Sequence, residues 1–231
     1  MNTLYISMNQ REKLLGWPWL ICCAFVMPPL FNLWPGALSF CLEAAIGFAG
    51  VMLIFHRFFL ASMHVPHTTF TQILLKASLG LVISFVANIA MNDLFFFYLP
   101  KYFSYTDYGP MYFNVNEAAF TELVQHDLLL TAPAFVILIP AAEEILFRGL
   151  LFGSLFRRNR LLAYVISTGL FAFLPALGLI GHYPADYIVL NVLQYVPLGL
   201  ILGWVYTCTE TIITPIVLRM LLHTLAICSM R

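Results

Sequence analysis

Long apolar stretches dominate the chain, and the polar positions between them mark where one stretch ends and the next begins. A helix that crosses a bilayer needs about 20 mainly apolar residues. Two stretches are longer than a crossing requires, so we expect these helices to tilt or to extend beyond the bilayer. The pattern predicts an all-α, polytopic membrane protein with about seven transmembrane helices, at residues 15–34, 37–59, 72–99, 128–156, 161–181, 187–207 and 211–230.

The composition agrees with a membrane environment. Hydrophobic residues make up 61% of the chain and charged residues only 10%, whereas soluble domains carry roughly a quarter charged residues. Water cannot solvate a surface with so few charges, so the lipid bilayer is the expected surrounding. The formal net charge is zero and no basic run is present, so we expect no nucleic-acid partner.

The segment 100–127 is the only sizeable polar connection. It is rich in tyrosine and phenylalanine and carries four acidic residues, a composition that suits the membrane interface. No linker and no clear internal repeat divides the chain. We therefore predict a single membrane domain over 1–231, in which 1–127 supplies three N-terminal helices and this loop, and 128–231 supplies the last four helices.

The basic residues indicate the orientation in the membrane. Arg11 and Lys13 precede the first predicted helix, and Arg157, Arg158 and Arg160 separate the fourth from the fifth. Lysine and arginine favour cytoplasmic loops. We therefore predict an integral protein of the cell inner or plasma membrane, with a cytoplasmic N-terminus and the C-terminus outside.

The fourth predicted helix carries three charged residues far from its ends, Glu143, Glu144 and Arg148. Glu143 precedes Arg157 by fourteen residues, or about 21 Å of helix, and charges at such depth usually mark a functional cavity. Glu144 and Arg148 are four residues apart and can pair along one face. One arginine cannot neutralise two carboxylates, so one acid either takes a second partner or keeps its proton, and it becomes a candidate general base. The alternative is a buried ion pair that only orders the bundle.

These charges belong to a pattern with a family likeness. Glu143-Glu144-x-x-x-Arg148-Gly149 resembles the first motif of the CAAX-protease and bacteriocin-processing family. These intramembrane proteases include the prenyl-protein endopeptidases and the Abi-type bacterial proteins. Leu170-Phe171-Ala172-Phe173 is similar to the start of the second motif, and the stretch from Gly199 to Pro215 is similar to the approach to the third. The resemblance spans about residues 128–228 and implies that 128–231 forms a CAAX-protease-like core.

The chain departs from the family at both histidine positions. The resemblance implies a histidine four residues after Phe171, where this chain has Pro175, and a later His-x-x-x-Asn pair, where it has Arg219 and His223. In the family, the glutamates and histidines are thought to activate a water molecule, with or without a metal. The implied set is therefore reduced here to Glu143, Glu144, Arg148 and a displaced His223.

Two functions follow from this set. Arg219 lies one turn before His223, and an arginine inside the membrane needs an acid, for which Glu143 or Glu144 is at hand. In the first function, the protein is a hydrolase, an intramembrane endopeptidase, in which Glu143 and His223 activate water and Arg219 stabilises the oxyanion. Its substrate would be a membrane-associated or lipid-modified protein or peptide. In the alternative, Arg219 locks the carboxylates, and the protein is a non-catalytic relative acting as a membrane scaffold, immunity or binding protein.

No cofactor can be assigned with certainty. A zinc site takes three or four ligands, and the predicted set offers only Glu143, Glu144 and His223. A divalent metal therefore remains an open alternative with an incomplete ligand set. The expected partners are the lipid bilayer and a protein or peptide substrate at the membrane. A transporter or channel is disfavoured, because no inverted repeat is evident and the membrane charges concentrate in one half of the chain.

Overall fold

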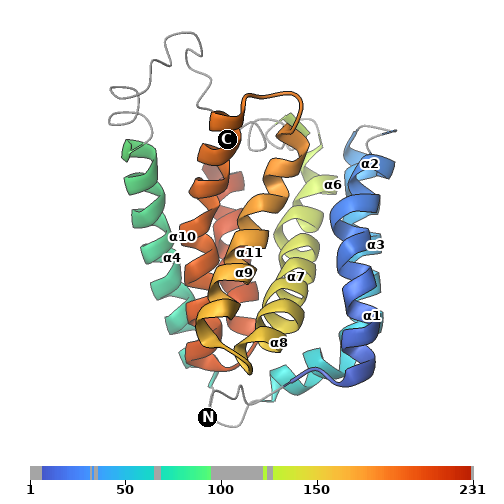
Figure 1. The fold of residues 1–231 in the computed structure, drawn as a ribbon, viewed down its shortest axis with the longest axis vertical. Helices are drawn as coiled ribbons and strands as arrows, with labels where there is room; N and C mark the ends of the chain where they lie inside the picture. Colours follow the sequence, from blue (N-terminus) through green and yellow to red (C-terminus); the bar gives the residue numbers. More distant parts are fainter. Residues whose placement is uncertain are drawn as a thin grey trace.

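A computed structural model describes residues 7–31, 33, 36–64, 69–94, 122–123 and 127–229. These residues form helices and contain no β-strand, which confirms the all-α prediction. The helices lie side by side in a bundle (Figure 1). The beginning of α1 and the end of α11 lie at opposite ends of this bundle. The predicted interfacial loop, 100–127, lies almost wholly outside the described residues.

The polytopic membrane prediction is also confirmed. Six helices in the described part are long and apolar enough to cross a bilayer, and α11 (Ile213–Ser229) is an apolar but shorter seventh helix of about 26 Å. Many large apolar side chains of the described helices are exposed on the surface of the bundle. Such a surface fits lipid and would be costly in water. The six spans are Gln10–Phe31, Ala37–Met63, Phe70–Met91, Leu128–Phe156, Arg160–Leu179 and Ala185–Thr209.

The first helix begins five residues before the predicted start because a capping box fixes its end. The Asn9 side chain accepts the N–H of Glu12 at 2.8 Å, and the Glu12 carboxylate accepts the N–H of Asn9 at 2.7 Å. The other Glu12 oxygen accepts the N–H of Phe58 at 3.0 Å, three residues after a kink at Phe55. This contact joins the beginning of α1 (Gln10–Ile21) to α3 (Ala37–Met63).

The N-terminal helices pack closely on one another. After α1 the chain continues through a π-helical turn (Cys22–Val26) into α2 (Met27–Phe31). A Cβ atom at Gly50 of α3 would overlap the ring of Trp19, whose indole N–H donates to the Gly47 carbonyl. Next comes α4 (Phe70–Asp93), which packs against α10 and α11 in the second half of the chain.

The fourth span is one continuous helical run with π-helical turns inside it. π-helical turns carry an extra residue and frequently occur at functional sites. The run consists of α6 (Leu128–Pro133), η4 (Ala134–Leu138), α7 (Ile139–Glu144), η5 (Ile145–Phe152) and α8 (Gly153–Phe156), of which η4 and η5 are π-helical. All eight residues of η5 are buried, so this segment is surrounded by other helices.

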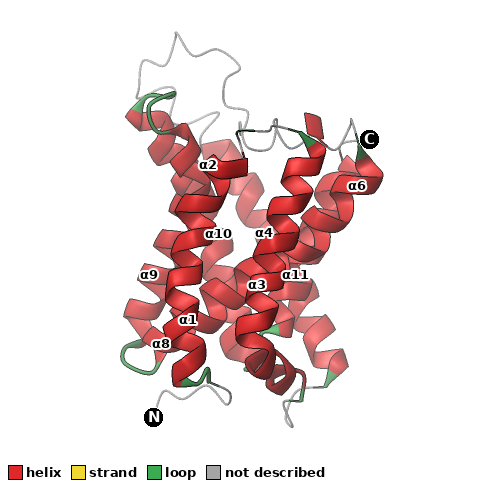
Figure 2. Cartoon of the chain, turned by 90° about the vertical axis from the view of Figure 1, so that its right-hand side faces the viewer, coloured by secondary structure: helices red, strands yellow, loops and turns green. Residues whose placement is uncertain are grey.

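The last part of the chain adds three more helices, of which α9 and α10 pack against η5. They are α9 (Arg160–Phe173) with its 3₁₀ extension η6 (Leu174–Leu179), α10 (Ala185–Thr209) and α11. A Cβ atom at Gly199 would lie 2.8 Å from Cγ2 of Thr168, and one at Gly203 would lie 2.9 Å from the Tyr164 ring. These small residues let α10 approach α9 closely. Figure 2 shows the same bundle from the side of α1 and α3.

Candidate functional site

The two adjacent glutamates lie at the end of α7 and differ in exposure. The Glu144 side chain is completely buried, whereas the Glu143 side chain is 38% exposed. Successive residues on a helix point about 100° apart, so one carboxylate faces the interior and its neighbour faces a cavity. Of the two acids, Glu143 is the one that a water molecule or a ligand can reach.

Glu144 pairs with Arg148 one turn later, which confirms the predicted pair. Arg148 Nε donates to the Glu144 carboxylate at 3.3 Å, and Arg148 Nη1 donates to Ser167 Oγ on α9 at 2.8 Å. Ser167 in turn donates to the Phe147 carbonyl at 3.2 Å. Both charged side chains are fully buried, so this network fixes η5 against α9.

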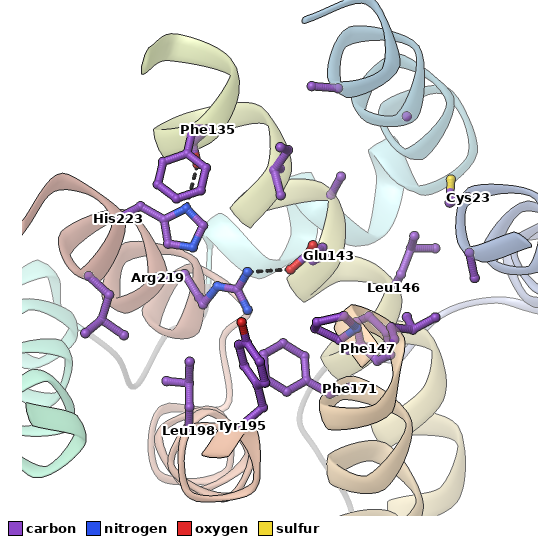
Figure 3. Close-up of a pocket in the computed structure, with 18 of the residues that line it drawn as sticks. Cys23, Phe135, Glu143, Leu146, Phe147, Phe171, Tyr195, Leu198, Arg219 and His223 are labelled. Carbon is purple, nitrogen blue, oxygen red and sulfur yellow. Dashed lines mark hydrogen bonds and ion pairs between the residues drawn. The ribbon is translucent and has the colours of Figure 1, made fainter. Parts of the chain in front are cut away.

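Arg219 supplies the second cation and pairs with Glu143, as predicted (Figure 3). Its Nη2 donates to Glu143, and its Nη1 lies 3.9 Å from the Glu144 carboxylate. The Arg219 side chain is only 7% exposed. One guanidinium on α11 therefore lies between both motif glutamates, and Tyr195 of α10 points its hydroxyl end toward it (Figure 3).

Phe171, at the family's second-motif position, contacts both arginines. The guanidinium carbons of Arg148 and Arg219 each lie 5.1 Å from the centroid of its ring. A cation over an aromatic face is stabilised by the negative charge of the π-system. Phe147 packs edge-on against the same ring, with centroids 5.6 Å apart. This phenylalanine therefore helps to hold two like charges inside the bundle.

His223 is held by the helix that carries Glu143. Its Nδ1 lies 2.7 Å from the Phe135 carbonyl, and its ring stacks on the Phe135 ring with centroids 4.1 Å apart. A carbonyl oxygen can only accept a hydrogen bond, so Nδ1 carries a proton. In the neutral imidazole, Nε2 then holds the lone pair and is the nitrogen that can accept a proton.

The π-helical turn explains why the Phe135 carbonyl can hold the histidine. In η4 the N–H of Ile139 reaches back five residues to Ala134. The equivalent partner for Phe135 would be the N–H of residue 140, which is a proline and has no N–H. The sequence thus places Pro140 where it leaves a backbone acceptor available to α11.

Glu143, Arg219 and His223 share a cavity of about 660 Å³. Pro175, where the family resemblance implies a histidine, lines the same cavity. The cavity is lined by the last four helices together with α1, α3 and α4. Glu144 and Arg148 were expected to point into the cavity, but neither lines it, because both are buried behind its wall.

Sequence reasoning missed several residues of this region. Ser167, the partner of Arg148, is a small polar residue within an apolar helix and gives no distinct signal. Glu43 of α3 lines the cavity together with Phe40, Ala44 and Gly47. Their spacing of three, four and seven residues marks one helical face, and an acid on such a face was a signal that could have identified it.

A divalent metal does not fit the residues present. The Arg219 guanidinium donates to Glu143 and approaches Glu144, so a cation already accompanies both glutamates. The Nδ1 of His223 is engaged by a carbonyl. Within the described residues, no group of three histidine, cysteine, aspartate or glutamate side chains could share one ion.

Comparison with known proteins found one similarity, to a protein family. No curated protein and no solved structure matches the chain. Residues 125–225 match the family described as type II CAAX prenyl endopeptidase Rce1-like. The match runs from before α6 into α11 and includes Glu143, Glu144, Arg148, Arg219 and His223. Over these residues the chain is similar to the CAAX protease family.

Proposed function

We propose that this protein is an intramembrane endopeptidase of the CAAX-protease type. It would cleave a peptide bond of a membrane-associated or lipid-modified protein or peptide. The observation that carries the proposal is that a partly exposed carboxylate, Glu143, and an imidazole held through its Nδ1, His223, line one cavity inside a helical bundle. A carboxylate and an imidazole near one water molecule are sufficient for general acid–base catalysis.

In this mechanism Glu143 accepts a proton from water while the water oxygen attacks the peptide carbonyl carbon. The protonated carboxyl group is neutral and no longer needs a counterion, so Arg219 can transfer its donor to the new oxyanion. The C–N bond then breaks, the proton on Glu143 passes to the leaving amine nitrogen, and the carboxylate is restored. His223 Nε2 orients the attacking water by accepting its second hydrogen.

The buried network behind the cavity wall has a positioning role in this proposal. Glu144, Arg148 and Ser167 hold η5 against α9. Phe171 fixes the planes of both guanidiniums. Glu143 lies on the last turn before η5, so its position depends on this support. Arg219 has two roles, because it is the counterion of Glu143 at rest and the oxyanion donor during the reaction.

A second candidate function rests on the same ion pair. In the resting structure, the proposed base is bound to a permanent cation, and both family histidine positions hold other residues. Such an arrangement also suits a non-catalytic member that acts as a membrane scaffold, immunity or binding protein. In that case the Arg219–Glu143 pair would be needed for stability alone, and neither charge would take part in chemistry.

Two substitutions distinguish the candidates in cells. Glu143→Gln keeps the shape of the side chain and removes its ability to accept a proton, whereas Arg219→Leu removes the ion pair. An endopeptidase loses its cellular phenotype with Glu143→Gln while the protein remains present in the membrane. If Glu143→Gln preserves the phenotype and Arg219→Leu abolishes it, the scaffold function is correct.

We further propose a cytoplasmic N-terminus, an outer C-terminus and a location in the inner or plasma membrane. The support is the basic residues near the beginning of α1 and at the α8–α9 connection. A reporter fused to each end provides the test, with alkaline phosphatase active outside the cell and green fluorescent protein fluorescent inside. Phosphatase activity from an N-terminal fusion would reverse the assignment.

A further inference from the structure

The cavity contains a charged residue that the proposed mechanism does not use. Glu43 lies six residues inside the beginning of α3, about 9 Å along the helix. It lines the cavity on the face shared with Phe40, Ala44 and Gly47, whereas Glu143 reaches the cavity from α7. Within the described part of the chain, the Glu43 carboxylate has no hydrogen bond and no ion pair.

The charges around the cavity do not balance. Three carboxyl groups (Glu43, Glu143 and Glu144) accompany two guanidiniums (Arg148 and Arg219), so one acid has no cation of its own among the described residues. Arg148 is committed to Glu144, and Arg219 to Glu143 with Glu144 nearby. Neither arginine forms an ion pair with Glu43. Glu43 is therefore the carboxyl group that has no cationic partner among the described residues.

A carboxyl group within an apolar bundle either keeps its proton or needs a cation beside it, so a cationic ligand would supply what Glu43 lacks. The Glu43 side chain is partly exposed to a cavity whose lining is largely apolar, from Leu20 and Met27 on one side to Leu198 and Leu222 on the other. A volume of about 660 Å³ accommodates a small ligand or a short stretch of peptide. A matching ligand would combine apolar groups with a single positive charge.

We propose that Glu43 is the cation-binding subsite of this cavity, which takes an apolar chain bearing one ammonium or guanidinium group. The chain fills the apolar part of the cavity, and the positive group pairs with Glu43. Arg219 and Glu143 remain paired with each other and face a different part of the ligand. The inference concerns binding and does not require that the protein be a protease.

The test compares matched ligands on the purified full-length protein in lipid nanodiscs. Decylamine and decanol share one alkyl chain and differ in charge. A hydrophobic octapeptide with one lysine and its norleucine analogue form a second pair. Comparing the two pairs shows whether the cavity prefers a positive charge carried by a peptide or by a simple amphiphile. Dissociation constants are measured by thermophoresis, and mass spectrometry monitors the peptides for cleavage.

We expect at least one charged ligand to bind about tenfold more tightly than its neutral match, the smallest effect expected for a partly desolvated charge pair. Glu43→Gln should remove this preference, and Glu43→Asp should retain part of it. Asp93→Asn, at the exposed end of α4 and outside the cavity lining, removes the same charge and should leave the preference unchanged.

Two results would overturn the proposal. One is equal binding of the charged and neutral members of both pairs by the wild-type protein. The other is a preference that persists in Glu43→Gln or disappears in Asp93→Asn. Cleavage plays no part in this comparison, so loss of the proposed peptidase function and loss of the cation subsite are separate outcomes.

Discussion

The guanidinium of Arg219 on α11 donates to the carboxylate of Glu143 on α7, 76 positions earlier in the chain. The contact joins the final helix to the helix that carries both motif glutamates. It neutralises the one motif acid that is accessible from the cavity. In the proposed mechanism, the same guanidinium stabilises the oxyanion that forms beside Glu143. In the proposed mechanism, stability and chemistry therefore both depend on the Arg219–Glu143 pair.

Arg219→Leu should destabilise the protein by about 2 kcal/mol. This value lies between the small contribution of exposed ion pairs and the roughly 3–5 kcal/mol lost when a fully buried pair is broken, because Glu143 is partly exposed. Unfolding in detergent monitored by circular dichroism gives the measurement. The double variant Arg219→Leu/Glu143→Gln should recover part of the loss. If the double variant is as unstable as the sum of the single ones, the two side chains are not coupled.

Ser167→Ala should lower the free energy of unfolding by about 1–3 kcal/mol, since Arg148 Nη1 would lose its acceptor in a fully buried position. Ser154→Ala is the matched control, because the buried Ser154 hydroxyl has no hydrogen-bond partner among the described residues. We expect that control to stay within about 0.5 kcal/mol of the wild type. Equal losses for both variants would show that the hydrogen bond to Arg148 contributes nothing.

The proline that follows the π-helical turn η4 should control the orientation of His223. Pro140→Ala supplies an N–H that can satisfy the Phe135 carbonyl and compete with His223 Nδ1. We expect a change in the tautomer of the His223 ring, observed by ¹⁵N NMR, and a fall in peptidase activity of about tenfold, similar to losing an outer-shell partner of a functional histidine. Pro133→Ala, on the same helical run before η4, should change neither. An unchanged tautomer in Pro140→Ala would refute this relationship.

Chelation should leave the proposed peptidase activity unchanged, because the residues around Glu143 do not fit a metal ion. The assay compares activity after EDTA treatment and after zinc is added back. Pro175→His with Arg219→His restores the family's histidines around the same cavity, and this double variant should become metal-dependent. Complete inhibition of the wild-type protein by EDTA, reversed by zinc, would contradict the assignment.

Much of the fold follows from the sequence because apolar stretches of spanning length leave few alternatives in a bilayer. The ends of helices depend on local signals instead. Because of the capping box of Asn9 and Glu12, the first helix begins five residues earlier in the chain than predicted, although both residues could be read from the sequence. π-helical turns such as η4 depend on how the helix packs, and a single sequence does not reveal them.

The candidate site was only partly predictable. The Glu144–Arg148 pair was predictable because residues four apart lie on the same face of any helix. The Arg219–Glu143 pair was predictable because an arginine inside the membrane needs an acidic partner. Glu43 was missed because a lone acid in an early helix has no motif neighbour, and only the packing of α3 places it on the cavity. The role of Phe171 between two arginines likewise depends on the three-dimensional arrangement.

Glu143 is the base in the proposed peptidase mechanism, and its effect on peptide cleavage can be measured with purified protein. Purified protein in nanodiscs is incubated with a proteome-derived peptide library, and new peptide ends are counted by mass spectrometry. The wild-type protein should generate new ends, and Glu143→Gln should reduce their rate of formation by at least about 100-fold, with Asp93→Asn as the unchanged control. If the wild type and Glu143→Gln generate the same ends at the same rate, or neither generates any, Glu143 is not a catalytic base.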